Sequence, residues 1–279
     1  MDAYKFDLEA YLNRINFSGA TDVSEDTLAR LHHAHFHAVP FENFDILLGR
    51  GIDLDPQAVF NKLVLEKRGG YCFELNGLFL QALKSLGFDA RALLARVHVT
   101  GTPSGRGHQL ELVSIDGRYW VADVGFGGNS PRMPLPLELG YSSTKEGQTV
   151  QLTDRADFGT MLQILKEGEW KDLYSFDMGR VFPADIAYGN HYTSTSPHSF
   201  FTFSRVGGRP LPGGEITLLD RTLKIKAQGR HEVLTLPDGP AYLDAVKKYL
   251  GIELDAPYNE LRPLPPEGGE HSPKGRATT

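Results

Sequence analysis

The spacing of the hydrophobic residues changes near residue 89, and this change constrains the fold more than any other feature of the sequence. From about residue 5 to residue 90, apolar side chains recur every three or four positions, which is typical of amphipathic helices. From about residue 89 to residue 155 they alternate with polar ones, which is typical of β-strands. The pattern therefore predicts a mostly helical part followed by a part built of strands.

Composition excludes several classes of protein. The 279 residues are 41% hydrophobic and 23% charged, which are ordinary values for a globular protein. The net charge of −6 argues against a general nucleic-acid binder, since it provides no basic field to attract phosphates. We see no apolar segment of the kind found in signal peptides or membrane spans, so we expect a cytosolic protein without a membrane partner.

The single cysteine, Cys72, lies at the start of a helical pattern. Apolar spacing predicts a helix from about Tyr71 to Leu86, so the sulfur would sit in its first turn. There the helix dipole favours the thiolate, which is the nucleophilic form. The preceding Gly69-Gly70 would let another molecule approach the sulfur closely. The alternative is an inert cysteine packed as a small hydrophobe, which is the usual fate of a free cysteine.

A β-hairpin is predicted directly after a glycine-rich segment. The runs 108–115 and 118–124 alternate apolar and polar residues, and Asp116-Gly117 between them is the strongest short signal for a two-residue hairpin turn. Such a turn pairs Ile115 with Arg118, which sets the register of every other pair in the hairpin.

In this register Leu110 lies opposite Asp123, and His108 is the diagonal neighbour of Asp123 on the same face. That face is otherwise largely apolar and is expected to point inward, since it also carries Leu110, Leu112, Tyr119 and Val121. A histidine and an aspartate on such a face should be paired, because a buried unpaired charge is costly. The pair is either a satisfied core pair or a base with the acid that orients it.

Cys72, His108 and Asp123 together supply the nucleophile, base and orienting acid of a catalytic triad. Three other carboxylates could orient the imidazole instead: Asp45, Glu74 and Asp89. The hairpin register supports only Asp123 in this role. The Cys72 N–H is a candidate oxyanion donor. Gly127-Gly128, after the hairpin, could form an anion-binding nest for a pyrophosphate.

A histidine cluster between residues 32 and 37 invites a metal-site interpretation, because His33 and His37 are four residues apart on a predicted helix. We expect no metal site there, since no cysteine or carboxylate nearby in the sequence completes a zinc-type ligand set. The expected alternative is a partly solvated helix face.

The rest of the chain is predicted as further strands, a short helix near Tyr242–Leu250 and a Pro- and Gly-rich end. Strands are expected at 149–152, 160–165, 170–176 and 199–205, with two more between 215 and 236. Residues 266–279 have little to bury and are expected to be disordered.

Four motifs together resemble the arylamine N-acetyltransferase family. They are Pro-Phe-Glu-Asn at 40–43, Arg-Gly-Gly-Tyr-Cys-Phe-Glu at 68–74, the spacing to His108, and Asp-Val-Gly-Phe-Gly at 123–127. The resemblance covers roughly the first two thirds of the chain, plus a turn near 195–197. It implies an α+β fold with an N-terminal helical bundle (1–88), a central β-barrel (89–198) and a C-terminal α/β lid (199–265), built around a papain- or transglutaminase-like cysteine triad.

The resemblance also implies roles for individual residues. Cys72 would be acetylated by acetyl-CoA, with His108 as base and Asp123 as its orienter. Phe41, Val97 and Phe126 match positions that line the acceptor pocket, and Ser104 and Gly105 resemble the short polar pair before the histidine that contacts coenzyme A. Gly127 is a further candidate coenzyme A contact, because of the anion-binding nest that Gly127-Gly128 could form. Arg68 and Glu42 match a structural ion pair beside the cysteine.

The implied function is ping-pong transfer of an acetyl group from acetyl-CoA to an arylamine or arylhydrazine. A thiolate suits this chemistry because its attack on a thioester yields another thioester at little thermodynamic cost. Acetyl-CoA would be a co-substrate, with no permanently bound cofactor. Two alternatives remain at this stage: a cysteine hydrolase or transamidase with the same triad, and a non-catalytic binding module with an inert thiol. The sequence leaves the oligomeric state open.

Overall fold

The N-terminal part of the chain is helical. The computed structural model describes residues 4–265, so the predicted disorder of 266–279 lies outside the described residues. The helices here are α1 (Leu8–Arg14), α2 (Glu25–Ala38), α3 (Phe44–Leu47), α4 (Pro56–Phe60), its π-helical continuation η1 (Asn61–Leu65) and α5 (Cys72–Ser85). Ser24 caps α2, since its side chain accepts a hydrogen bond from Thr27 N as its position in the sequence predicts.

The predicted helix after the cysteine is confirmed, and its apolar stripe is the centre of the first core. Residues at helical spacing on α5 pack against α1, α2, α4 and the outer face of the sheet, namely Leu75, Phe79, Ala82 and Leu83. The helix ends before Gly87, whose φ of +89° is a conformation that glycine adopts without a Cβ penalty. This packing fixes the position of the helix start, where Cys72 lies.

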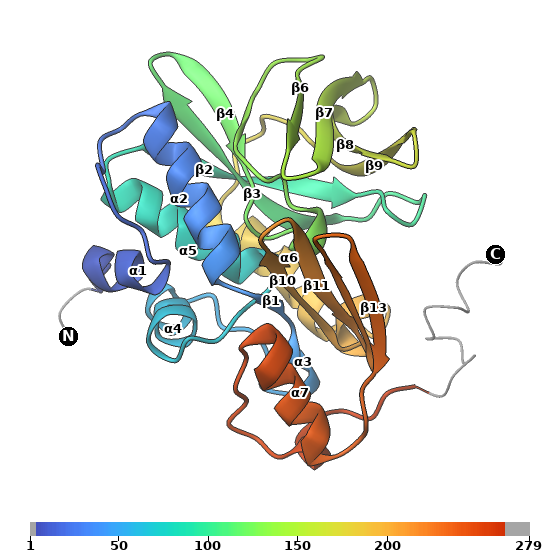
Figure 1. The fold of residues 1–279 in the computed structure, drawn as a ribbon. Coiled ribbons are helices and arrows are strands. Elements are labelled where there is room, and N and C mark those ends of the chain that lie inside the picture. The colour runs from blue at the N-terminus through green and yellow to red at the C-terminus, as the bar shows by residue number, and fades with distance from the viewer. Residues whose placement is uncertain (1–3, 266–279) are drawn as a thin grey trace.

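Eight antiparallel strands curve into a nearly closed barrel (Figure 1). They are β2 (Asp89–Val97), β3 (Arg106–Ile115), β4 (Arg118–Ala122), β5 (Leu135–Pro136), β6 (Ser142–Lys145), β7 (Gln148–Arg155), β8 (Gly159–Lys166) and β9 (Glu169–Phe176). Their order in the sheet is β5-β4-β3-β2-β9-β8-β7-β6. Alternate residues of seven of these strands, β6 excepted, fill the interior, including Leu93, Leu110, Val121, Leu152 and Leu162.

The hairpin register predicted from Asp116-Gly117 is confirmed, since Ile115 pairs with Arg118 and the pairs continue to Glu111 with Ala122. One residue of the predicted inward face is an exception. Tyr119 is 51% exposed because it lies near the turn, beyond the edge of the interior.

A second antiparallel sheet and one helix form the C-terminal lid. The sheet has the order β1-β10-β11-β12-β13, and α7 packs against it. The bounds are β1 (Phe41–Glu42), β10 (Val206–Leu211), β11 (Gly214–Leu219), β12 (Thr222–Ala227), β13 (Arg230–Thr235) and α7 (Pro240–Leu250). Strand β1 comes from the N-terminal part of the chain, so it ties the lid to the segment just before the cysteine motif.

Two predictions for the C-terminal part were wrong. The segment 199–205 is not a strand, because Phe200–Thr202 form a short 3-10 helix, and three strands, not two, lie between 214 and 235. A further helix, α6 (Pro183–Thr195), joins the barrel to the lid. The other predicted strands are confirmed as β7, β8 and β9.

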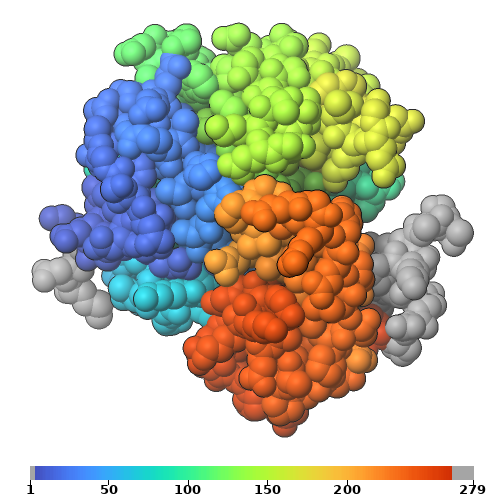
Figure 2. Space-filling model, viewed as in Figure 1, coloured from blue at the N-terminus to red at the C-terminus, as the bar shows by residue number. Residues whose placement is uncertain are grey.

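The helical, barrel and lid parts meet around a common centre (Figure 2). This arrangement is the α+β fold of helical bundle, barrel and lid that the sequence indicates, while the exact domain boundaries stay a prediction. Within residues 4–265, no helix is long and apolar enough to cross a bilayer.

Candidate active site

Cys72 is the first residue of α5 and lies where the helix, barrel and lid meet. It is 5% exposed, and its thiol points toward the carbonyl oxygen of Gly107 at 3.8 Å. The Glu74 carboxylate accepts a hydrogen bond from Tyr71 N at 3.1 Å, which caps the start of the helix. The sulfur is therefore held at a helix N-terminus, as the sequence predicts.

The glycines before the cysteine have a different role from the predicted one. A Cβ on Gly69 would lie 2.2 Å from the carbonyl oxygen of Pro40, and a Cβ on Gly70 would lie 2.9 Å from the Glu74 carboxylate. Both residues are buried against protein atoms. They allow close packing between the β1 segment and the start of α5, not the approach of a second molecule to the sulfur.

The hairpin brings His108 and Asp123 into direct contact. Nε2 of His108 lies 2.8 Å from Oδ2 of Asp123, and the side chains are 2% and 0% exposed. Because Nε2 is taken by Asp123, Nδ1 is the ring nitrogen left for the hydrogen bond that His108 makes with Cys72. The imidazole of His108 therefore interacts with both of the other predicted triad residues, Asp123 and Cys72.

Electrostatics in this contact favour the charged forms of both partners. Burial lowers the pKa of His108, but the charge of Asp123 and hydrogen bonds with Asp123 and Cys72 outweigh it and raise that pKa to about 10. Burial likewise raises the pKa of Asp123. The charge of His108, and the hydrogen bonds that Asp123 accepts from His108, Asn76 and Gly125, outweigh this effect and hold that pKa below its usual value. The pair is an imidazolium facing a carboxylate.

Asn76 is a residue that sequence reasoning missed. Its Nδ2 donates to Oδ1 of Asp123 at 2.9 Å, and its Oδ1 accepts from Val124 N at 3.0 Å. Gly125 N also donates to Oδ1 of Asp123, at 2.9 Å. A signal was available, because Asn76 lies four residues after Cys72 and so shares its face of the helix.

The predicted ion pair beside the cysteine is confirmed. Arg68 binds both carboxylate oxygens of Glu42, at 2.8 and 2.9 Å, and Asp45 at 3.2 Å. Lys62 bridges Asp45 and Glu74, with its nitrogen 2.7 Å from Glu74 Oε1. These contacts occupy two of the alternative orienting acids, Asp45 and Glu74. The third, Asp89, is exposed at the start of β2.

A cavity of about 1020 Å³ opens beside the sulfur. Its walls include Cys72 and His108 together with every residue for which the sequence indicates a substrate or coenzyme A contact: Phe41, Val97, Phe126, Ser104, Gly105 and Gly127. The hydroxyl of Ser104 is engaged within its own loop, since it accepts from Val97 N at 2.9 Å and donates to Gly105 O at 2.7 Å.

Aromatic rings pack against the imidazole of His108, and other aromatic rings line the cavity. The ring of Phe126 lies 4.7 Å from that of His108, and Tyr174 lies 4.9 Å from the same imidazole on the barrel side. Helix α6 adds Tyr188 and Tyr192, which are 79% and 58% exposed. Neither Tyr174 nor α6 could be assigned to the site from sequence, because each reaches it only through the folded barrel.

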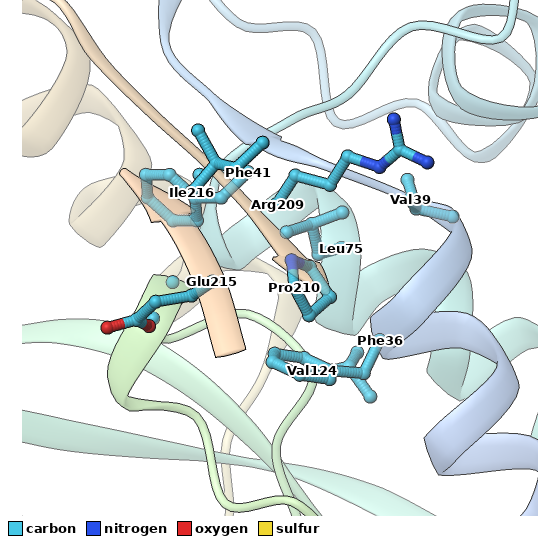
Figure 3. A pocket seen from close by; sticks show the side chains of 12 residues that line it. Phe36, Val39, Phe41, Leu75, Val124, Arg209, Pro210, Glu215 and Ile216 are labelled. Atoms are coloured by element: carbon cyan, nitrogen blue, oxygen red, sulfur yellow. The ribbon is translucent and has the colours of Figure 1, made fainter. Parts of the chain in front are cut away.

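The anion nest expected at Gly127-Gly128 stays a prediction. A Cβ on Gly128 would lie 2.5 Å from a carboxylate oxygen of Glu215, so a negative charge already lies against this turn. Figure 3 shows a smaller hollow between α2, α5 and the strands β10 and β11, where Phe41 lies beside Ile216. Phe41, Gly127, Gly128 and Gly208 line both hollows.

The histidine cluster is not a solvated face throughout. His32 and His35 are fully buried, with His32 Nε2 3.1 Å from Asp123 O and His35 Nδ1 2.9 Å from the Tyr11 hydroxyl. Burial lowers their pKa values to about 4 and about 3, so both are neutral. His33 and His37 instead face the carboxylate of Glu146. Glu146 is distant from them in the sequence, so neighbouring residues alone could not indicate this contact.

Comparison with known proteins agrees with this geometry. A family model for N-acetyltransferases matches residues 24–258. The chain is 37% identical over 252 residues to the arylamine N-acetyltransferase of Escherichia coli, and the aligned region covers 89% of each chain. The fold superposes on the Salmonella typhimurium arylamine N-acetyltransferase with a TM-score of 0.85 at 34% identity, over 91% of this chain and 94% of that one.

A Mycobacterium marinum arylamine N-acetyltransferase solved in complex with CoA gives a TM-score of 0.83 at 36% identity, over 88% and 93% of the two chains. The fold and the family model define an acyl-transferring enzyme of the N-acetyltransferase class. Within that class, the chain belongs to the arylamine N-acetyltransferase family.

Proposed function

We propose that this enzyme transfers an acetyl group from acetyl-CoA to the nitrogen of arylamines or arylhydrazines through an acetyl-cysteine at Cys72. The observation that carries the proposal is that His108 interacts with both Cys72 and Asp123, while Cys72 and His108 line a cavity of about 1020 Å³. That volume is at the upper end of the range for small-molecule sites, about 300–1,000 Å³. The cytosol stays the predicted location.

In the first half-reaction, the Cys72 sulfur attacks the thioester carbonyl of acetyl-CoA. The new carbon–sulfur bond forms as the bond to coenzyme A breaks, and His108 gives its proton to the departing thiolate. Asp123 stabilises the imidazolium and keeps its Nδ1 directed at the sulfur. The Cys72 N–H belongs to the first turn of α5, where N–H groups have no acceptor within the helix, so it is a candidate donor to the oxyanion.

In the second half-reaction, the amine attacks the acetyl-cysteine, His108 takes the proton from nitrogen, and the Cys72 sulfur leaves. The rings of Phe41 and Phe126 offer a flat apolar surface for an aromatic acceptor next to the imidazole. Coenzyme A would approach along the loop of Ser104 and Gly105. Because the Ser104 hydroxyl is engaged, we expect that loop to contribute backbone groups. Gly127 would contribute space beside Phe41.

The experiment is intact-mass analysis after brief exposure to acetyl-CoA alone. We expect one acetyl group on the wild-type chain, none on Cys72→Ala, and its rapid loss when an aniline is added. Initial rates should give the parallel double-reciprocal lines of a ping-pong mechanism. An acetyl group that is lost to water equally fast without the amine would instead favour the hydrolase alternative. Failure of Cys72 to acquire any acetyl group would overturn the proposal.

A further inference from the structure

Two histidines of α2 and one glutamate of the barrel converge on the side of the molecule formed by α2 and the β6–β7 hairpin. His33 and His37 are one helical turn apart, and both direct Nε2 at the carboxylate of Glu146, which lies in the turn between β6 and β7. The distances are 2.8 Å from His33 Nε2 to Oε1 and 3.2 Å from His37 Nε2 to Oε2. The mechanism proposed above uses none of these groups.

The geometry of the three groups matches a metal-ligand set. One ligand atom from each residue lies within 4.8 Å of the other two, and the imidazole rings are 4.2 Å apart. Ligands about 2 Å from a tetrahedral metal ion lie about 3.3 Å from one another, so only small side-chain rotations are needed to enclose an ion. Histidines four residues apart on one helix face are a recurrent arrangement for zinc.

We propose that His33, His37 and Glu146 bind one divalent transition-metal ion of the Zn²⁺ type, with water as the fourth ligand. Two imidazoles and a carboxylate are one of the ligand sets that zinc takes when one coordination position stays open. The side chains of His33, His37 and Glu146 are 48%, 22% and 24% exposed. An ion can therefore enter from solvent, and a water molecule can complete the tetrahedron.

The charge of Arg132 acts on His37 and Glu146, and it opposes binding of a further positive charge. Its guanidinium, however, is directed elsewhere: it donates to the carbonyl oxygens of Ser130 and Gly128, at 3.1 and 3.0 Å, and lies 3.6 Å from Glu215. It also lies over the ring of Phe36, 4.7 Å from its centroid. These contacts hold Arg132 in place and partly neutralise it, so it weakens the site without filling it.

The β6–β7 turn presents Glu146 to α2. Glu146 has a φ of +49° and Gly147 a φ of +76°, as a two-residue hairpin turn requires at both positions. Asparagine, aspartate and glycine are the usual residues at the first position. A glutamate there has the longer side chain that reaches α2.

An ion at this site would link the barrel to the helix that contacts the backbone of Asp123. The residue before His33 in α2 is His32, whose Nε2 lies 3.1 Å from the backbone oxygen of Asp123. Because the ion would bind only the folded chain, it would raise the midpoint temperature of thermal unfolding. The expected effect is a brace on α2, not participation in acyl transfer.

The test measures Zn²⁺ binding by equilibrium dialysis and calorimetry in a Cys72→Ala background, which removes the thiol as a competing ligand. We expect one Zn²⁺ per chain and a rise in the unfolding midpoint. In the same background His33→Ala and Glu146→Gln should each weaken binding at least about tenfold, because even outer-shell changes cost about 10- to 100-fold. His231→Ala, an exposed histidine on β13, is the matched control and should bind normally.

A second measurement identifies the ligands directly. Cu²⁺ in place of Zn²⁺ should give an electron paramagnetic resonance spectrum with coupling to two imidazole nitrogens, reduced to one in His33→Ala or His37→Ala. The proposal is overturned if the Cys72→Ala chain binds no Zn²⁺, or if folded His33→Ala and Glu146→Gln variants bind as tightly as the control. Circular dichroism of each variant establishes that it is folded before binding is compared.

Discussion

The side-chain amide of Asn76 lies 2.9 Å from Oδ1 of Asp123 and so determines which carboxylate oxygen faces His108. Because Oδ1 also accepts from Gly125 N, Oδ2 alone is left for the imidazole. Asn76 comes from the same helix as Cys72. One helix thus carries the sulfur and holds the acid that orients the base, and the predictions below test this arrangement.

Asp123→Asn should abolish most of the transfer while leaving the fold intact. The donors from Asn76 and Gly125 will keep the amide oxygen at the Oδ1 position, which directs the new NH₂ group at His108 Nε2. Nε2 must then accept, so the proton moves to Nδ1 and the imidazole cannot take one from Cys72. We expect kcat to fall about 10⁴-fold, the size of loss that a wrong tautomer causes in serine proteases. Steady-state kinetics with a fall of less than tenfold would contradict this.

Asn76→Ala should lower kcat with little change in KM, because Asn76 acts as a positioning residue through Asp123. The substitution also leaves buried Gln109 O and Val124 N with one partner fewer. We expect a loss of about 1–3 kcal/mol in the free energy of unfolding per unsatisfied group. Asn13→Ala, on the exposed face of α1, is the control. If stability falls but the pH profile of Cys72 alkylation is unchanged, Asn76 is only structural.

The free energy of unfolding should decrease between pH 6.5 and pH 10. The pKa of His108 is raised from 6.5 to about 10, so its contribution is complete below pH 6.5 and is lost as the pH rises through about 10. The pKa of Asp123 is lowered from 3.8, so its contribution is present above pH 3.8 and is lost as the pH falls through the folded-state pKa. Urea titrations should show a slope of at most about 1.4 kcal/mol per pH unit on the alkaline side. His108→Gln should flatten that slope, and an unchanged slope would refute the assignment.

Two glycine substitutions should have opposite effects. A Cβ on Gly125 would lie 2.9 Å from Cys72 Cα and 2.7 Å from Asn76 Nδ2, so Gly125→Ala should displace the site, destabilise the chain by about 1–3 kcal/mol and reduce transfer. Gly77 lies in α5 with no heavy atom within 4 Å of its Cβ position. Gly77→Ala should therefore stabilise the chain by about 0.5–1 kcal/mol. Chemical denaturation of both variants, beside acetyl-transfer assays, checks the pair; equal behaviour would count against the close contact at Gly125.

Several features of the fold and site were predictable because neighbouring residues determine them. The α5 helix and its cysteine at the N-terminus follow from apolar spacing alone, since the stripe and the cap lie within one segment. The His108–Asp123 contact follows from a two-residue turn, because such a turn fixes the pairing of every residue in its hairpin.

Other features failed because distant partners decide them. Residues 199–205 have a strand-like composition. However, Asn43 Nδ2 donates hydrogen bonds to the carbonyl oxygens of Phe201 and Ser204, at 2.8 Å each, and these bonds hold the segment in a turn. The carboxylate facing His33 and His37 lies more than a hundred residues further along the chain. Sequence proximity cannot reveal either partner.

By itself the sequence determined the local geometry of this protein: a sulfur at a helix start, and an imidazole and a carboxylate on one hairpin face. Tertiary structure alone decided what surrounds them, because the packing of the barrel and lid sets which side chains of remote segments meet. The role of Asn76, the Tyr174 ring behind the imidazole, the cavity beneath α6 and the His33–His37–Glu146 group all depend on that packing. Local hydrogen-bond geometry can be inferred from spacing along the chain, whereas the contacts of a closed barrel exist only once its strands are paired.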